Sequence, residues 1–219
     1  MIILSDLSEV LIHGLQGTEE VVKEKYGDRT ADKFYRRMMD IEVDNCFRNL
    51  LRGYIKEDTF WLTFLSEDYW PFDYKQAEKL FGENLQRPRI DGVLEVYSSI
   101  TAYPEKIGSE KKCTGRPQIW IISDHVKERI SDLHEYHKDL FDLVDQEIWS
   151  CSMGKVKGDD GFFERILEDN SIQLDDVVFI DDWDRNTKKA TSLGIQCIEF
   201  KDAEQLKDSL TNLGFEFMV

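Results

Sequence analysis

The sequence predicts an α/β fold in which a doubly wound parallel sheet carries an inserted α-helical cap. Two observations lead to this prediction. Short apolar runs without alternating polarity recur along the chain, as expected for strands that are buried on both faces of a parallel sheet. Helical patterns separate these runs in the second half, and a long helical block follows the first run.

In chain order, the expected strands are residues 2–4, 119–122, 147–149, 177–180 and 195–198; four of them are short apolar runs, and residues 147–149 are a fifth candidate. Apolar residues at helical spacing lie between the last four, near residues 126–133 and 162–167. Gly194 stands where a helix that begins near Asp184 should end, because glycine favours the left-handed conformation at helix C-termini. Alternating strands and helices of this kind predict a Rossmann-like core. Residues 104–117, bounded by prolines and rich in basic side chains, are expected to form a mobile surface loop.

The helical block covers residues 15–90 and predicts a separate cap beside the active face of the sheet. The α/β core would then comprise residues 1–14 and 91–219. Inside the block, an apolar stripe runs through residues 34–51 and includes Ile41. The topology therefore predicts a site at the carboxyl ends of the strands, covered by helices.

Composition excludes several classes of function. The 219 residues contain 44 acidic and 28 basic side chains, a net charge of −16, which disfavours nucleic-acid and anionic-lipid partners. No apolar run approaches the roughly 18 residues of a membrane span, and the first residues do not resemble a signal peptide. The four cysteines are scattered without the spacing of a zinc site or a disulfide framework. We expect a cytoplasmic monomer or homodimer with no nucleic-acid or membrane partner.

Polar side chains that could take part in catalysis or ligand binding follow the expected strands. They are Asp6 after the first strand, Ser123 and Asp124 after the second, Lys157 before a helix, and the pair Asp181 and Asp182 after the fourth. Taken singly, a carboxylate such as Asp124 or Asp182 often caps the next helix. Because all of them emerge at one edge of one parallel sheet, the set predicts a common site.

The order and spacing of these residues resemble the four motifs of the haloacid dehalogenase (HAD) superfamily, in the subfamily with a helical, C1-type cap after the first motif. The most specific part is the apolar strand that ends at Asp181 and Asp182, followed by Asn186, Ala190 and Gly194 at the family spacing. The resemblance spans essentially the whole chain, although it is loose in the cap.

This resemblance implies a Mg²⁺-dependent phosphoric monoester hydrolase that acts on a small phosphorylated metabolite, with sugar phosphates among the candidates. Asp6 would be the nucleophile that forms an aspartyl-phosphate, with Lys157 also catalytic. Ser123, Asp124 and Lys157 would bind the phosphate group. The implied Mg²⁺ ligands are all oxygens, from Asp6, the backbone carbonyl of Ser8, Asp181 and Asp182.

One position departs from the family pattern. Ser8 stands where phosphatases of this family carry an aspartate that acts as general acid and base, a role worth about 10²–10⁴ in rate. The adjacent Glu9 is a poor substitute, because neighbouring side chains diverge on a turn. The resembled subfamily includes members with a small residue here and glucose-1-phosphatase-type activity, so a phosphatase is still expected. The alternative is a catalytically weak or inactive HAD-fold protein with a binding or regulatory role.

Two further alternatives concern the reaction and the cap. Dehalogenation fits poorly, because the acid pair implies a bound cation where a released halide would need a cationic site. In the cap, Arg48 and Arg52 lie four residues apart, near Trp61 and Trp70 in sequence. They could contact the leaving group of a substrate. The favoured interpretation is that the arginines pair with acids and the tryptophans are core residues.

Overall fold

A five-stranded parallel sheet forms the centre of the protein in a computed structural model, which describes residues 1–39, 46–66 and 69–218. The strand order is β5-β4-β1-β6-β7, and every neighbouring pair is parallel. In chain order these strands are β1 (Ile2–Ser5), β4 (Gln118–Ser123), β5 (Gln146–Trp149), β6 (Val177–Asp181) and β7 (Gln196–Glu199). The predicted fold class and the five predicted strand runs are confirmed.

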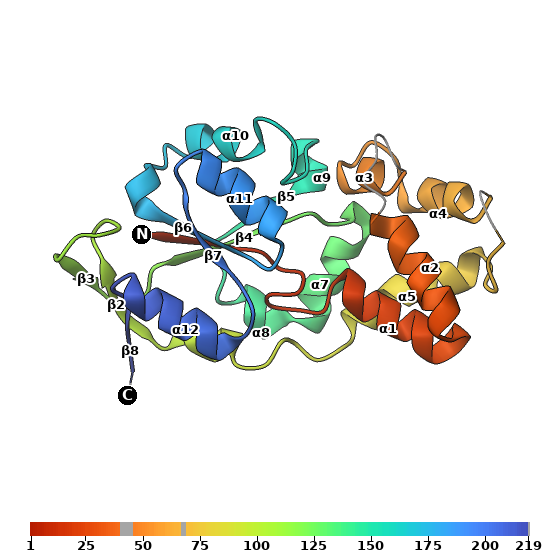
Figure 1. The fold of residues 1–219 in the computed structure, drawn as a ribbon, viewed down its shortest axis with the longest axis horizontal. Coiled ribbons are helices and arrows are strands. Elements are labelled where there is room, and N and C mark those ends of the chain that lie inside the picture. The colour runs from red at the N-terminus through yellow and green to blue at the C-terminus, as the bar shows by residue number, and fades with distance from the viewer. Residues whose placement is uncertain (40–45, 67–68, 219) are drawn as a thin grey trace.

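Both faces of this sheet are buried, because successive residues of each strand pack into different hydrophobic clusters. Ile3 belongs to one cluster and Leu4 to another, as do Ile180 and Phe179. The first face packs against α6 (Val93–Ser98), α7 (Ile130–Tyr136), α8 (Lys138–Phe141) and α12 (Ala203–Asn212). The second packs against α10 (Phe162–Asp169) and α11 (Asp184–Ser192). Figure 1 shows α10 and α12 on opposite sides of the sheet, the arrangement of a doubly wound fold.

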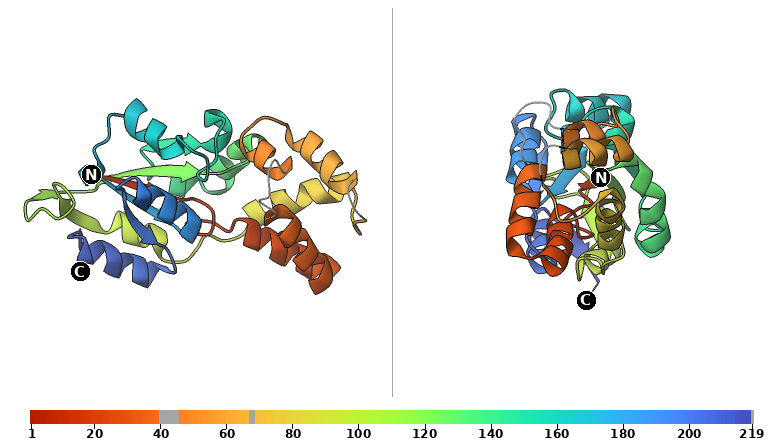
Figure 2. Two further views of the ribbon diagram at one scale, coloured as in Figure 1. Left: turned by 45° about the horizontal axis from the view of Figure 1, so that its top comes forward. Right: turned by 90° about the vertical axis from the view of Figure 1, so that its right-hand side faces the viewer.

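A helical region lies beside the carboxyl end of the sheet (Figures 1 and 2). It contains α1 (Leu15–Tyr26), α2 (Asp28–Met39), α3 (Cys46–Leu51), α4 (Glu57–Ser66) and α5 (Tyr74–Leu85). These helices bury their own apolar cluster around Phe34, Phe60 and Trp61. Ile41, part of the predicted stripe, lies outside the described residues. The boundary residues of the cap stay a prediction.

The loop prediction for residues 104–117 is wrong for its central part. Residues Lys112–Thr114 form strand β3, which pairs antiparallel with β2 (Ile100–Pro104), and β8 (Glu216–Phe217) completes a small sheet of order β3-β2-β8. The two strands are joined by a turn in which Gly108 takes a φ of +78°. Backbone pairing stabilises β3. Its residues bury little apolar surface, so the sequence contains no apolar run that would predict a strand there.

Three short helical elements complete the described chain: η1 (Lys127–Arg129), α9 (Ser150–Met153) and η2 (Leu174–Asp176). In the part of the chain that the structure describes, no helix is both long enough and apolar enough to cross a membrane.

Polar contacts fix the helical region against the sheet domain. The Arg129 guanidinium donates to both carboxylate oxygens of Glu57, at 2.8 and 2.7 Å, and Glu57 also accepts a hydrogen bond from the Trp61 indole. The Ser150 hydroxyl donates to the backbone carbonyl of Leu51 at 2.6 Å. Beside this contact, Gly53 has a φ of +71° and packs so closely that a Cβ there would lie 2.5 Å from the Cys151 carbonyl oxygen.

Gly53→Ala is therefore expected to lower the free energy of unfolding by roughly 2–4 kcal/mol, from backbone strain together with the clash. Gly108→Ala is the matched control, because Gly108 also has a positive φ but, in the described part of the chain, no atom within 4 Å of its would-be Cβ. The control should cost about 1 kcal/mol. Urea denaturation of both variants measures the difference, and equal losses would contradict the close packing at Gly53.

Candidate active site

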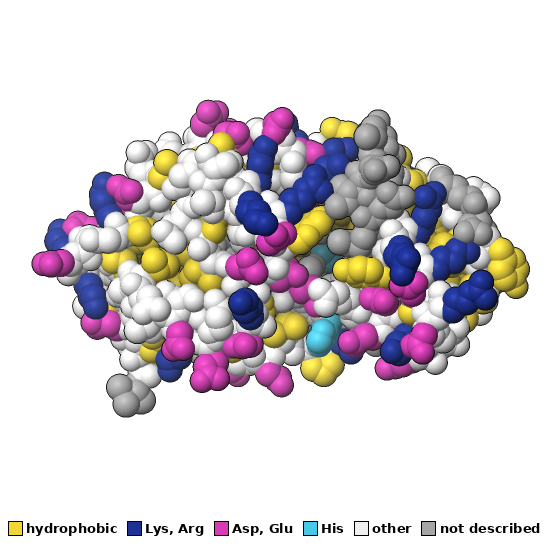
Figure 3. Space-filling model, viewed as in Figure 1, with side chains coloured by type: hydrophobic (Ala, Val, Ile, Leu, Met, Phe, Trp, Pro, Cys, Tyr) yellow, Lys and Arg dark blue, Asp and Glu magenta, His cyan; other side chains and the backbone are white. Residues whose placement is uncertain are grey.

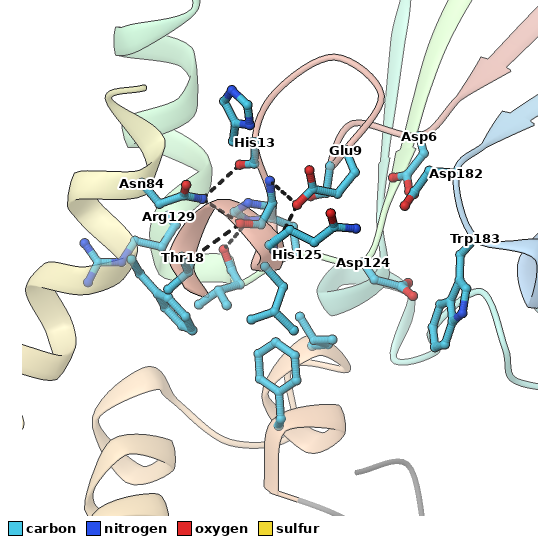
Figure 4. Close-up of a pocket in the computed structure, with 18 of the residues that line it drawn as sticks. Asp6, Glu9, His13, Thr18, Asn84, Asp124, His125, Arg129, Asp182 and Trp183 are labelled. Atoms are coloured by element: carbon cyan, nitrogen blue, oxygen red, sulfur yellow. Dashed lines mark hydrogen bonds between the residues drawn. The ribbon is translucent and has the colours of Figure 1, made fainter. Parts of the chain in front are cut away.

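The carboxyl end of β1 places Asp6 at the centre of the sheet edge. The Asp6 amide donates to the Ile180 carbonyl at 2.8 Å, so the residue is held against β6. Its carboxylate accepts a hydrogen bond from the Leu7 amide at 2.6 Å. Asp181 and Asp182 follow from β6, and Figure 4 shows the Asp6 and Asp182 side chains close together. Strand register thus brings together acids that lie 175 residues apart in sequence.

Lys157 lies between two of these acids. Its ammonium is 2.5 Å from Asp6 and 2.6 Å from Asp181, and the side chain is only 2% exposed. Burial opposes the charge, but Asp181, Asp6 and Asp124 outweigh burial and raise the pKa of Lys157. Burial, partly opposed by Lys157, also raises the pKa of Asp6 well above its usual range. The lysine is therefore a fixed cation that offsets repulsion within the acid cluster.

Asp181 and Asp182 differ in their burial and in the hydrogen bonds that their carboxylate oxygens accept. One Asp181 oxygen accepts hydrogen bonds from the Trp183 amide and the Asn186 side chain, and the other accepts from Lys157 and Asn186. Asp182 is less buried, and burial together with the Asp181 charge raises its pKa to about 6. Both Asp181 oxygens therefore already accept hydrogen bonds within the protein, whereas Asp182 faces the pocket beside Asp6 (Figure 4).

Ser123 and Asp124 occupy the edge of β4. The Ser123 hydroxyl is fully buried and has no hydrogen-bond partner among the described residues, an arrangement that is costly unless a ligand supplies one. Asp124 does not cap a helix. Its carboxylate instead accepts the Lys157 amide at 3.0 and 3.3 Å, and burial raises its pKa to about 6 against the opposing charge of Lys157.

The loop that carries Lys157 is also tied to the helical region. Asp159 accepts the Val156 amide at 3.0 Å and pairs with Arg52 at 2.9 and 2.7 Å and with Arg48 at 3.1 Å. The favoured interpretation of these arginines as ion-pair partners is confirmed. Trp61 is fully buried, so it cannot stack on a ligand.

Glu9 has a structural contact that sequence reasoning missed. It has a φ of +59°, and its carboxylate accepts the Gly14 and Gln16 amides, each at 2.9 Å, at the start of α1. A carboxylate just ahead of a helix is a recognisable capping signal, but the reach of five to seven residues is unusual. This contact anchors the entry into the helical region.

The acid cluster fits a hard divalent cation. Asp6, Asp181 and Asp182 each offer one oxygen, and these oxygens all lie within 4.8 Å of one another. A donor set made only of oxygen suits Mg²⁺. Ser8, whose backbone carbonyl was a predicted ligand, lines the same pocket.

A cavity of about 260 Å³ opens from this cluster between the sheet edge and the helical region. Asp6, Lys157 and Asp182 line its sheet side, and residues of α1, α2, α3 and α5 line the other. On the face drawn in Figure 3, hydrophobic and acidic side chains surround a hollow at this position. Of the predicted site residues, Asp6, Ser8, Asp124, Lys157 and Asp182 thus line one pocket, while Ser123 and Asp181 are buried outside its lining.

Comparisons with solved structures identify this architecture. A predicted HAD-like family hydrolase from Porphyromonas gingivalis aligns over 97% of this chain and 96% of its own, with 20% identity and a TM-score of 0.69. The chain has the HAD-like fold. A HAD family enzyme from Bacteroides thetaiotaomicron, in complex with magnesium and inorganic phosphate, covers 92% of this chain and 94% of its own, at 16% identity and a TM-score of 0.59.

L-2-haloacid dehalogenase from Xanthobacter autotrophicus shares the HAD-like fold over 96% of this chain and 82% of its own, with 12% identity and a TM-score of 0.63. No family model matches the sequence. Among curated proteins, drimenol cyclase drtB from Aspergillus calidoustus is 36% identical over 75 residues, which is 34% of this chain and 14% of that protein. The chain therefore spans only a small part of the length of that relative.

Lys157→Met tests whether the lysine holds the acid cluster together. Without magnesium at pH 7.5, we expect a loss of about 3–5 kcal/mol in the free energy of unfolding, because buried carboxylates lose their counter-charge. Lys155→Met is the control: this lysine contacts the backbone carbonyl of Asp160 near the surface and should change stability by no more than about 0.5 kcal/mol. Similar unfolding curves for the two variants would contradict the assigned role.

Proposed function

We propose that this protein is a Mg²⁺-dependent phosphatase of a small phosphorylated metabolite, with Asp6 as the nucleophile. The main support is the arrangement around Lys157, in which a buried cation neutralises two carboxylates beside a third that faces a covered pocket. The fold is also that of a HAD family enzyme in complex with magnesium and inorganic phosphate. The acid cluster by itself would accept sugar phosphates and other phosphate monoesters alike.

In this proposal the Asp6 carboxylate attacks phosphorus, and the bond from phosphorus to the ester oxygen breaks. The leaving oxygen keeps the electron pair and takes a proton from water. A second water then attacks phosphorus, the bond to Asp6 breaks, and inorganic phosphate leaves. Lys157 and the Ser123 hydroxyl hold phosphoryl oxygens, and the unpartnered state of that hydroxyl supports this role.

Asp6, Asp182 and the backbone carbonyl of Ser8 would hold the metal ion. Asp181 is the least available of the predicted ligands, because its oxygens already accept hydrogen bonds from Lys157, Asn186 and Trp183. When bound, Mg²⁺ would neutralise charge on the transferring phosphoryl group. The same acid cluster supports phosphoryl transfer over halide displacement, which has no use for a divalent cation.

A second candidate is a HAD-fold protein that binds ligand but turns over slowly. Ser8 cannot donate a proton near neutral pH, and the Glu9 carboxylate already accepts two backbone hydrogen bonds. The leaving group must then take its proton from water, which slows the release of an ordinary alcohol. The lack of an available acid at Ser8 and Glu9 is the observation that favours this second candidate.

Asp6→Asn tests the nucleophile. The amide cannot form an acyl phosphate, so phosphate release from a panel of phosphate monoesters with Mg²⁺ should fall by at least about 10³-fold. Asp208→Asn, a change at an exposed position of α12, should retain full activity. Undiminished phosphate release by Asp6→Asn, or none from wild-type protein on any ester, would rule out the proposed reaction.

Ser8→Asp separates the two candidates. If slow turnover reflects the missing acid, this variant should release phosphate about 10²–10⁴ times faster than wild type. Ser8→Asn is the matched control, since it adds similar bulk without a titratable proton. A gain in the aspartate variant alone favours the weak-turnover candidate, whereas no gain in either variant favours a phosphatase that works without that acid.

A further inference from the structure

We propose that the pocket selects phosphate esters whose leaving group is apolar, such as an alkyl or isoprenoid-like chain, rather than a sugar. This inference rests on the proposed phosphoryl site and adds the class of group attached to the phosphate. It comes from the described lining of the cavity between the acid cluster and the helices.

The helical side of the cavity is mostly hydrocarbon, with Gln16 of α1 and Tyr35 of α2 as polar side chains among its lining. Its apolar members are Leu15, Phe47, Leu51, Phe81 and Leu85, with Val126 from the sheet domain. The first four are only partly buried, although they pack at the edge of the hydrophobic cluster of the cap. Because exposed apolar surface is unfavourable in water, covering it with an apolar ligand would contribute directly to binding.

Several polar side chains in the lining are already occupied by the protein. The Asn84 amide donates to the carbonyls of His13 and Gly14 at 2.9 and 2.8 Å, and the Thr18 hydroxyl donates to Gly14 at 3.3 Å. Glu9 accepts the amides at the start of α1. These groups hold the entry into the helical region (Figure 4), so they contribute little to recognition of ligand hydroxyls.

The lysine and arginine side chains that line the described part of the cavity are already paired with carboxylates of the protein. Among its described residues, Lys157 and Arg129 are the Lys and Arg side chains, and they pair with Asp6 and Glu57 respectively. His125 is buried enough that its pKa falls to about 4, so the ring is neutral at physiological pH. A leaving group with its own carboxylate or second phosphate would therefore find no free cation among these side chains, whereas a neutral hydrocarbon needs none.

A chain-length series tests this inference without requiring turnover. Methyl-, propyl- and hexylphosphonate keep the phosphoryl group but cannot be hydrolysed as esters, and their binding with Mg²⁺ can be measured by calorimetry. We expect the Kd to fall about three- to fourfold per added methylene, a total of about 10²–10³ from methyl to hexyl. 2,3-Dihydroxypropylphosphonate, the polar counterpart of the propyl compound, should bind at least about tenfold more weakly than propylphosphonate.

Two variants locate the effect in the pocket. In Leu15→Gln, the ratio of the methylphosphonate Kd to the hexylphosphonate Kd should be at least about threefold smaller than in the wild type. General damage to the protein would instead weaken all members equally. Leu62→Gln is the control, since Leu62 lies on α4, is 62% exposed and does not line the cavity. Its chain-length dependence should match that of the wild type.

The inference fails if Kd is constant from methyl to hexyl, if the diol binds as well as propylphosphonate, or if no member binds in the presence of Mg²⁺. Phosphate release from hexyl phosphate and glucose 6-phosphate is scored separately. Chain-length-dependent binding without hydrolysis of any ester would support the apolar pocket and contradict the phosphatase. Faster hydrolysis of glucose 6-phosphate would support the phosphatase and overturn the apolar selection.

Discussion

The pairing of Lys157 with Asp6 and Asp181 is the interaction on which the rest of the site depends. Three carboxylates at one sheet edge repel each other strongly in a buried setting, and this lysine is the nearby cation that the structure places between two of them. Its position is fixed from two sides, because Asp124 accepts its amide and Asp159 accepts the amide of Val156. The acid cluster is therefore stable only while this loop is in place.

Much of the sheet and the placement of the acids could be predicted because they follow from local patterns. Runs such as 177–180 are apolar throughout, and the polar residue that follows each run lies at the same edge of a parallel sheet. Asp6, Ser123 and Asp181 could thus be brought together from the sequence alone. Strand β3 could not, since its exposed and half-buried residues form no apolar run and its stability comes from backbone pairing with β2.

Long-range polar contacts were the other part that could not be read from the sequence. Arg52 and Asp159 are 107 residues apart, and nothing local to either residue specifies the partner. Glu9 is similar, because its contact with the start of α1 depends on the positive φ that turns its side chain toward Gly14 and Gln16. The sequence also left the chemical character of the pocket open, since the side chains that line it come from helices that are distant along the chain.

The double contact of Asp159 has a mechanical consequence. The carboxylate that holds the amide next to Lys157 is also the one held by Arg48 and Arg52 of α3 and the turn after it. If the helices swing outward, the arginines leave, and the lysine loop loses part of its scaffold at the same moment. Access to the pocket and order in the Lys157 loop are thus opposed, so that the acid cluster is fully supported only when the entrance to the pocket is narrowed.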